Sequence, residues 1–266
     1  SGISIILPTL NERDNLKLLI PSIVEILDDL SIENYEVLVV DDNSTDGTKD
    51  LLERLNQKNS KIKIFIRSEV PSLPLSIWDG ISNSKFEFVM WLDADGSMNA
   101  KSIKKLIKTL SSNTKSVIIG SRFVENGGYK GVKNIGKDSF IDAIKNVYKS
   151  NDSVFGMIFS IFFNKLLKFL FFANINDITS GFIIGNKKYF LKKAFSRSSY
   201  GEYFIYLCND IIKQDIEIIE VGYICKTRVS GTSKTASSLP QLIMRGIPYI
   251  QAAIISRKEK YENLRW

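Results

Sequence analysis

Apolar and polar positions follow a repeated order through the first half of the chain: a short apolar run, a polar turn, and a helix with one apolar face. Apolar runs rich in β-branched residues are typical of buried parallel strands, whereas apolar positions three or four apart predict amphipathic helices. The predicted strands are residues 3–7, 35–40, 61–67, 86–92 and 116–119, and the predicted helices are residues 16–27, 49–55, 76–82 and 100–110. Pro8 is expected to stop the first strand, and Pro21 to kink or break the first helix. This order predicts a doubly wound α/β fold.

The most apolar segment of the chain is residues 154–173. Small or polar residues recur in it every four positions, which predicts a helix with one narrow polar stripe and a wide apolar face; they are Gly156, Ser160, Asn164 and Lys168. Lys165 and Lys168 lie too far inside the segment for a membrane span. We expect an interfacial helix, with burial in the core or in a dimer contact as the open alternative.

The flanking segments complete the expected architecture. Residues 125–152 are rich in glycine and lysine and carry a short helical pattern at 140–148, which favours either a flap near an anionic substrate or a solvated insertion. Strands are expected at 183–184 and 216–225, and helices at 187–194, at 201–213 and after Pro240, with a kink at Pro248. We expect a main domain at residues 1–236, including an insertion and apolar helix at 125–175, and a C-terminal amphipathic, membrane-associated segment at 237–266.

The composition of the chain limits which partners and which active-site chemistry are expected. With 266 residues, 44% hydrophobic and 24% charged, the chain fits one domain with additions. A net charge of +7 favours an anionic partner such as nucleotide phosphates or an anionic membrane surface, and the sequence carries no nucleic-acid-binding motif. It contains no histidine, which removes the commonest general base. Cys208 and Cys225 lack Cys-x-x-Cys spacing and the N-terminus lacks a signal-peptide pattern, so we expect a cytoplasmic protein.

Two acidic pairs stand at the ends of predicted strands, Asp41 with Asp42 and Asp93 with Asp95. In an extended chain alternate side chains share a face, so Asp93 and Asp95 are expected to point the same way, with Ala94 turned away. Hard carboxylate oxygens suit Mg²⁺ or Mn²⁺, although a solvated turn is an alternative interpretation. Ligands of open α/β sheets bind at the carboxyl ends of strands, so both pairs are expected to face one crevice. The glycine motifs of dinucleotide dehydrogenases and P-loop enzymes are absent from the sequence.

These residues carry a resemblance to glycosyltransferase family 2. Its motifs occur here in order: Ile6-Leu7-Pro8-Thr9-Leu10-Asn11-Glu12, Val39-Val40-Asp41-Asp42-Asn43-Ser44-Thr45-Asp46-Gly47-Thr48, Asp93-Ala94-Asp95 and Gly120-Ser121-Arg122-Phe123. Ser180-Gly181-Phe182 after Asp177, and the run from Arg228 to Lys234, make the chain similar to the dolichyl-phosphate mannose synthases and bacterial polyprenyl-phosphate glycosyltransferases of that family. The resemblance implies a Rossmann-like, GT-A type fold with a mostly parallel central sheet. It also implies inverting transfer from a UDP- or GDP-sugar to a polyprenyl phosphate, with Mg²⁺ or Mn²⁺ as cofactor.

The resemblance also implies roles for individual residues. Asp95 and Asp93 would bind the metal, and Asp93, Arg122 and Glu202 would be catalytic. The residues expected to bind the nucleotide sugar are Pro8, Asn11, Glu12, Asp41, Asp42, Asp93, Arg228, Ser233 and Lys234.

The chain departs from the family pattern at two places. Gly96-Ser97-Met98-Asn99 replaces the usual residues after Asp-x-Asp, and Glu69-Val70-Pro71-Ser72-Leu73-Pro74-Leu75 replaces a glycine-rich donor loop. Two alternatives therefore stay open: transfer to a saccharide hydroxyl in a glycan acceptor, and a degenerate homologue that binds nucleotide without turnover. We expect peripheral attachment on the cytoplasmic face of a membrane, and the sequence leaves a homo-oligomer open.

Overall fold

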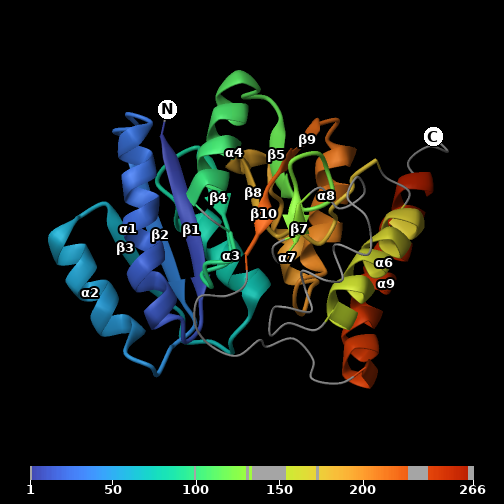
Figure 1. Cartoon of the computed structure of the whole chain (residues 1–266), viewed down its shortest axis with the longest axis horizontal. Coiled ribbons are helices and arrows are strands. Elements are labelled where there is room, and N and C mark those ends of the chain that lie inside the picture. The colour runs from blue at the N-terminus through green and yellow to red at the C-terminus, as the bar shows by residue number, and fades with distance from the viewer. Residues whose placement is uncertain are drawn as a thin grey trace.

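The computed structural model describes residues 2–98, 100–129, 132–133, 154–171, 174–226 and 239–262. Within these residues the core is a seven-stranded sheet in the order β3-β2-β1-β4-β8-β5-β9, and β8 alone runs antiparallel to its neighbours (Figure 1). The expected α/β class with a mostly parallel sheet is therefore confirmed. The strands are β1 Ile3–Thr9, β2 Tyr35–Asp41, β3 Ile62–Ile66, β4 Phe88–Trp91, β5 Val117–Ser121, β8 Ile183–Asn186 and β9 Ile218–Gly222.

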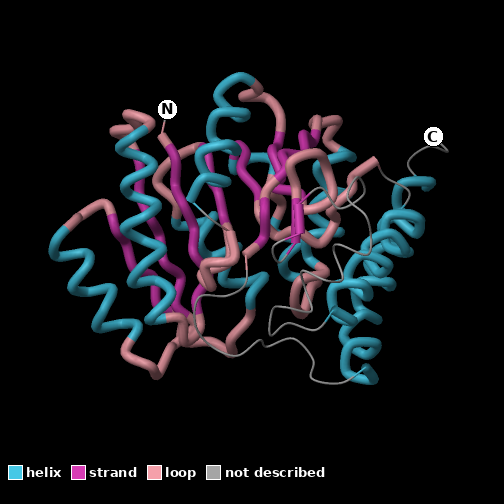
Figure 2. Tube along the Cα trace, in the orientation of Figure 1, coloured by secondary structure: helices cyan, strands magenta, loops and turns pink. Residues whose placement is uncertain are grey.

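Side-chain alternation along the strands divides the core into two layers. In β1, Ile5 and Leu7 face one layer, whereas Ile6 faces the other. The Ile5 layer is covered by α1 Arg13–Asp29, α2 Thr48–Lys58 and α4 Ala100–Ser112. The Ile6 layer is covered by α3 Leu73–Asn83, α7 Lys192–Ser196 and α8 Tyr203–Lys213, with α6 Val154–Phe171 and α9 Leu239–Glu262 side by side at the β9 end (Figures 1 and 2). Burial on both faces explains why the strand sequences are apolar runs.

The first strand continues past the proline that was expected to stop it. Pro8 pairs with Val40 and Thr9 with Asp41 in parallel register. The Thr9 carbonyl accepts a hydrogen bond from the Asp42 backbone N–H at 2.9 Å. Backbone polar groups of successive strand residues point to opposite neighbours, so the backbone nitrogen of Pro8 points toward β4. Pairing with β4 ends at Ile6, and the missing N–H of Pro8 therefore costs no strand bond. The two extra residues carry the strand end to the crevice.

Other element boundaries also differ from the predictions. Helix α1 passes through Pro21 and α9 through Pro248 without ending. Helix α3 begins at Leu73, three residues early, because the Ser72 hydroxyl accepts from the Leu75 N–H and caps it. The other predicted helices have shifted bounds: a 3₁₀ turn Lys187–Tyr189 precedes α7, and α8 starts at Tyr203.

The predicted strand 216–225 divides at Tyr223 into β9 and β10. Strand β10 Ile224–Cys225 joins β6 Gly128–Tyr129 and β7 Val132–Lys133 in a small second sheet. The helical pattern at 140–148 and the boundary at 236 lie outside the described residues.

The polar stripe of α6 faces the protein, not solvent. Asn164 is buried and donates to the Asn176 carbonyl, and Lys168 Nζ donates to Asn176 Oδ1 at 2.6 Å. Leu167 and Phe171 join the core, so part of the helix is buried as the alternative interpretation predicted. Its remaining apolar side chains Phe162, Leu166 and Phe169 are exposed. The Asn164 and Lys168 part of the polar stripe is thus explained by a neighbouring loop, and the outward face is apolar apart from the exposed Lys165.

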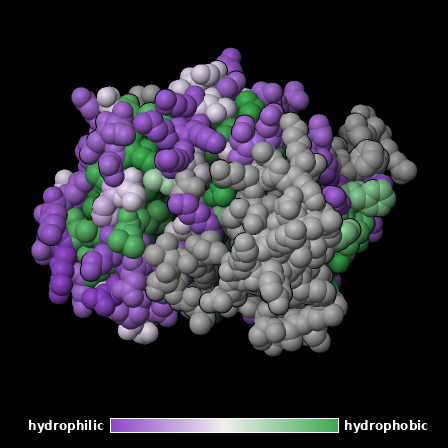
Figure 3. Space-filling model, in the orientation of Figure 1, coloured by the Kyte–Doolittle hydropathy of each residue, from purple (hydrophilic) through white to green (hydrophobic). Residues whose placement is uncertain are grey.

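Helix α9 continues the apolar surface that α6 begins. Met244, Ile247, Ile254 and Ile255 are exposed on it, so seven of the eleven exposed large apolar side chains in the described residues lie on these two helices. We call the seven residues the α6–α9 surface; apolar residues reach the right-hand edge of the molecule there (Figure 3). The inner side of α9 packs on α6 and α8, where Ala252 and Ala253 are fully buried. Within the described ranges, none of the helices combines the length and apolarity needed to cross a bilayer.

Candidate active site

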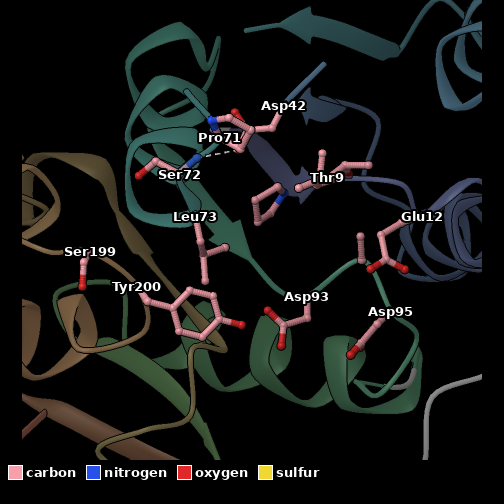
Figure 4. A pocket seen from close by; sticks show the side chains of 13 residues that line it. Thr9, Glu12, Asp42, Pro71, Ser72, Leu73, Asp93, Asp95, Ser199 and Tyr200 are labelled. Atoms are coloured by element: carbon pink, nitrogen blue, oxygen red, sulfur yellow. Dashed lines mark hydrogen bonds between the residues drawn. The ribbon is translucent and has the colours of Figure 1, made fainter. Parts of the chain in front are cut away.

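A cavity of about 230 Å³ lies at the carboxyl ends of β1, β2 and β4. This is the edge at which open α/β sheets bind ligands. Glu12 and Asp95 lie at one end, Ser199 and Tyr200 at the other, and Asp93 between them (Figure 4). The lining residues are Pro8, Thr9, Leu10, Glu12, Asp42, Pro71, Ser72, Leu73, Asp93, Ala94, Asp95, Ser199 and Tyr200.

Asp93 and Asp95 both reach the cavity, but from a turn and not from an extended strand. Strand β4 ends at Trp91, and the chain then turns through Gly96, whose φ of 76° is costly for other residues. Ala94, between them, is buried in the Ile5 layer and is also one of the residues that line the cavity. Asp95 Oδ1 accepts the Ser97 N–H at 2.9 Å, which orients the carboxylate. The turn therefore presents two carboxylates to one small space.

Asp42 forms another wall of the cavity and is held by buried donors. Its Oδ2 accepts from Ser76 Oγ at 2.6 Å and from the Ser72 N–H at 3.0 Å, and its Oδ1 pairs with Arg67 Nη1. Arg67 also donates from Nε to Asp79 Oδ2 at 2.7 Å. Burial alone lowers the pKa of Arg67, but Asp79 and Asp42 outweigh it and raise the pKa above its ordinary value. This network attaches the unusual segment before α3 to the end of β2, so that Pro71, Ser72 and Leu73 line the cavity.

Asn11 and Asp41, predicted to bind the nucleotide, do not line the cavity. Asn11 adopts a φ of 55°, accepts the Thr45 N–H at 2.8 Å through Oδ1, and donates its own N–H to Ser44 Oγ at 2.7 Å. Asp41 Oδ2 accepts the Ser44 N–H at 3.0 Å. Asn11 therefore fastens the loop after β1 to the loop after β2, and Asp41 holds Ser44 in place within that second loop.

Arg122, predicted to be catalytic, forms a bidentate ion pair with Asp177. Its Nε and Nη2 donate to the two carboxylate oxygens at 2.8 and 2.7 Å, its backbone N–H donates at 2.9 Å, and Nη2 also donates to Thr179 Oγ1 at 2.8 Å. Burial by itself lowers the pKa of Arg122, but the Asp177 carboxylate raises it well above its ordinary value. Arg122 does not line the cavity. The pair joins the end of β5 to the segment before β8.

Glu202, predicted to be catalytic, lies beneath the cavity wall. Its Oε1 accepts from the N–H and hydroxyl of Ser199 at 2.6 and 2.7 Å, and its Oε2 accepts the Tyr200 N–H at 3.0 Å. Ser199 and Tyr200 line the cavity whereas Glu202 does not. Sequence reasoning missed Ser199, Tyr200 and Ser72, because no motif marks them and they reach the cavity only through the fold.

Of the predicted site residues, the structure thus brings together Pro8, Glu12, Asp42, Asp93 and Asp95. Arg228, Ser233 and Lys234 lie outside the described residues. The described ranges contain no group of three or more His, Cys, Asp or Glu side chains arranged to bind a metal. Two carboxylates on one turn nevertheless match a hard cation whose remaining ligands come from a diphosphate and water. The donor set of Asp93 and Asp95 therefore fits Mg²⁺ or Mn²⁺ held jointly with a nucleotide.

Comparison with known proteins agrees with this geometry. The family described as Glycosyl transferase family 2 matches residues 4–192. A dolichol-phosphate mannosyltransferase from Pyrococcus furiosus is 34% identical over 125 residues, which are 47% of this chain and 34% of that protein. A poly(ribitol-phosphate) beta-glucosyltransferase from Bacillus spizizenii is 26% identical over 128 residues, 47% of this chain and 20% of that protein. The matches thus span about a third or less of these relatives' lengths.

Among solved structures, glucosyl-3-phosphoglycerate synthase from Mycobacterium tuberculosis has a similar fold. The two structures superpose with a TM-score of 0.64 at 16% sequence identity, and the alignment covers 97% of this chain and 80% of that one. That protein was crystallised with Mn²⁺, UDP and glucosyl-3-phosphoglycerate. The likeness extends the shared fold beyond residue 192, over nearly the whole chain.

Proposed function

Because the chain belongs to glycosyl transferase family 2, as its ordered motifs predict, we propose that it transfers a sugar from a UDP- or GDP-sugar to a polyprenyl phosphate. The observation that carries the proposal is the cavity at the strand ends, where Asp93 and Asp95 lie opposite Asp42 and the capped start of α3. The nucleoside would occupy the side formed by Pro8, Asp42 and Ser72. The diphosphate would lie against Asp93 and Asp95.

The reaction that suits this site is a single displacement with inversion. An acceptor phosphate oxygen forms a bond to the anomeric carbon, while the bond from that carbon to the diphosphate breaks and its electrons leave with the nucleoside diphosphate. Mg²⁺ or Mn²⁺, bound by Asp93 and Asp95, would supply positive charge for the leaving group. The narrow cavity aligns the donor, since positioning reactants supplies much of the rate enhancement. Arg228 and Lys234 are proposed to add positive charge, as the family resemblance implies.

The hydrogen bonds and the position of Glu202 favour a polyprenyl phosphate over a hydroxyl as the acceptor. A hydroxyl must lose its proton during attack and usually needs a positioned base, whereas a phosphate is already anionic. The oxygens of Glu202 accept three hydrogen bonds from Ser199 and Tyr200, and Glu202 does not line the cavity, so it is not positioned to take a proton from an acceptor hydroxyl there. The Pyrococcus relative, named for dolichol phosphate, supports the same choice.

The α6–α9 surface supports attachment to a membrane that holds such an acceptor. Its seven exposed apolar side chains form an outward face next to the exposed Lys165. Apolar side chains that enter the headgroup region, aided by cationic ones, give peripheral binding to anionic lipid. Cys208 and Cys225 are both free, in keeping with the cytoplasmic face of the membrane.

Transfer to a saccharide hydroxyl is the second candidate, motivated by the Bacillus relative named for poly(ribitol-phosphate) glucosylation. A direct assay separates the two. Purified protein is given UDP- and GDP-sugars with Mn²⁺, with undecaprenyl or dolichyl phosphate in one reaction and saccharides in another. Product on the polyprenyl phosphate is the expected result. Transfer to saccharide alone, with loss of activity in Glu202→Gln, would favour the second candidate, and nucleotide-sugar binding without any transfer would favour a degenerate homologue.

A further inference from the structure

Tyr200 presents its side chain to the cavity. It is 53% exposed, and its hydroxyl points toward Asp93 (Figure 4). It lies at the end of the cavity away from Glu12 and Asp95. An aromatic ring with one hydroxyl suits a sugar, because the ring face contacts C–H groups and the hydroxyl exchanges hydrogen bonds.

The backbone that carries Tyr200 is fixed from below by Glu202. The carboxylate is only 4% exposed and accepts the N–H groups of both Ser199 and Tyr200. Hydrogen bonds from backbone donors to a buried carboxylate are strong, so the segment 199–202 has little freedom to move independently. Glu202 therefore acts on the cavity through the position of Tyr200.

The same segment is supported from outside by Tyr249 of α9. A Cβ atom added at Gly201 would lie 2.1 Å from Tyr249 Oη and 3.2 Å from its Cζ, so the two residues are in direct contact. The Tyr249 ring in turn packs edge-on against Phe163 of α6, with ring centroids 6.0 Å apart. Gly201 is required here by close approach, so Tyr249 of the C-terminal helix packs against the segment that brings Ser199 and Tyr200 to the cavity.

We propose that Tyr200 is a specificity-determining residue that contacts the transferred sugar, and that Glu202 and Tyr249 are positioning residues that hold it there. This inference rests on the proposed function. It assigns the Tyr200 end of the cavity to the sugar, since the diphosphate lies against Asp93 and Asp95 and the nucleoside lies toward Asp42. Glu202 then serves as a support for the site and not as a general base.

Binding measurements separate the sugar from the nucleotide. Calorimetry on the full chain with Mn²⁺ compares UDP and GDP with their sugar conjugates, in wild type, Tyr200→Ala and Tyr200→Phe. We expect Tyr200→Ala to weaken binding of the nucleotide sugar by roughly tenfold, which corresponds to the loss of one or two contacts. Binding of the nucleoside diphosphate should be unchanged. If Tyr200→Ala weakens binding of both ligands equally, or weakens binding of neither, the proposed role of Tyr200 is overturned. A wild-type protein that binds neither ligand would instead overturn the proposed function, and this inference with it.

The positioning role is tested by a rescue experiment. Gly201→Ala should raise KM for the nucleotide sugar, because the new methyl group collides with the Tyr249 hydroxyl; Tyr249→Phe removes that oxygen, so the double variant should regain most of the loss. Gly185→Ala is the matched control: its Cβ would meet Val117 and Phe190 at 3.0 and 3.1 Å, and neither lines the cavity, so it should lower stability and not KM. Failure of Tyr249→Phe to rescue, in protein that remains folded, would refute the contact as a positioning device.

Glu202→Gln distinguishes a support from a base. The amide still accepts hydrogen bonds through its oxygen but cannot take a proton. We expect a raised KM, with the pH dependence of kcat unchanged. Loss of the acidic limb of the kcat profile would show that Glu202 acts as a base and would overturn its assignment to positioning.

Discussion

Arg122 and Asp177 form a bidentate ion pair in which the Asp177 side chain is fully buried and that of Arg122 is 12% exposed. The Asp177 backbone N–H in turn donates a hydrogen bond to Glu220 Oε1 of β9 at 3.0 Å. The pair therefore belongs to a polar network that joins β5, β9 and the segment before β8. The arginine of the Gly-Ser-Arg-Phe motif thus shapes the site through the fold around it.

We predict that Arg122→Ala destabilises the protein severely. Removing one partner of a buried pair leaves an uncompensated charge and typically costs about 3–5 kcal/mol. Arg122→Lys should restore only part of this, because an ammonium group cannot form the bidentate contact. Urea unfolding measures the effect, with exposed Arg54→Ala as the control. Unchanged stability combined with lost turnover would instead place Arg122 on a substrate phosphate.

Asp95→Ala should abolish metal-dependent transfer, and Asp93→Ala should reduce it severely. Loss of charge stabilisation at a leaving group typically costs about a hundredfold to a thousandfold in kcat. Activity is measured across a Mn²⁺ titration, with exposed Asp50→Ala on α2 as the control. Near-wild-type turnover of either variant in the presence of a chelator would refute the metal site.

Glu259 should make the attachment of α9 sensitive to acid. It accepts from Arg197 at 2.9 Å, Lys213 at 2.7 Å and Asn209 at 3.0 Å. Burial alone raises the pKa of Glu259, but the hydrogen bonds from Lys213 and Arg197 outweigh it and lower the pKa below its ordinary value. A carboxylate with a lowered folded-state pKa contributes stability that is complete above its unfolded pKa and is lost as the pH falls through the folded one.

Melting curves of Glu259→Gln test this dependence. We expect a lower Tm than wild type at pH 7, by several degrees for a loss of about 1–2 kcal/mol, and a smaller difference at pH 3. Glu53→Gln is the matched control, since its pair with Lys49 is more than half exposed on both sides. A difference between Glu259→Gln and wild type that stays constant over this pH range would contradict the linkage.

The α6–α9 surface should bind anionic vesicles. Replacing Phe162, Leu166 and Phe169 together by serine should weaken sedimentation with vesicles by roughly tenfold or more, because each buried apolar side chain contributes more than 1 kcal/mol. Salt should weaken wild-type binding without abolishing it, since only the charged contribution is screened. Leu18→Ser, an exposed apolar residue on α1, is the control. Equal sedimentation of the triple variant and wild type would exclude this surface as the membrane contact.

The sequence by itself determined the layered α/β fold and the family. Apolar runs marked the strands because both faces of the sheet are buried, and the acidic residues after β2 and β4 met at one crevice because parallel strands end at the same edge. Local patterns are sufficient for these features, since periodicity and strand ends depend on neighbours along the chain.

The tertiary structure alone decided which partner each polar side chain takes. Asp42 pairs with Arg67, Arg122 with Asp177, and Gly201 contacts Tyr249, 48 residues later in the chain. No periodicity relates these positions, because crossovers and helix packing bring them together. The family resemblance singled out Glu202, but only the fold connects it to Tyr200 and the cavity, since burial and hydrogen-bond geometry, and not residue type, decide whether a carboxylate reacts or supports.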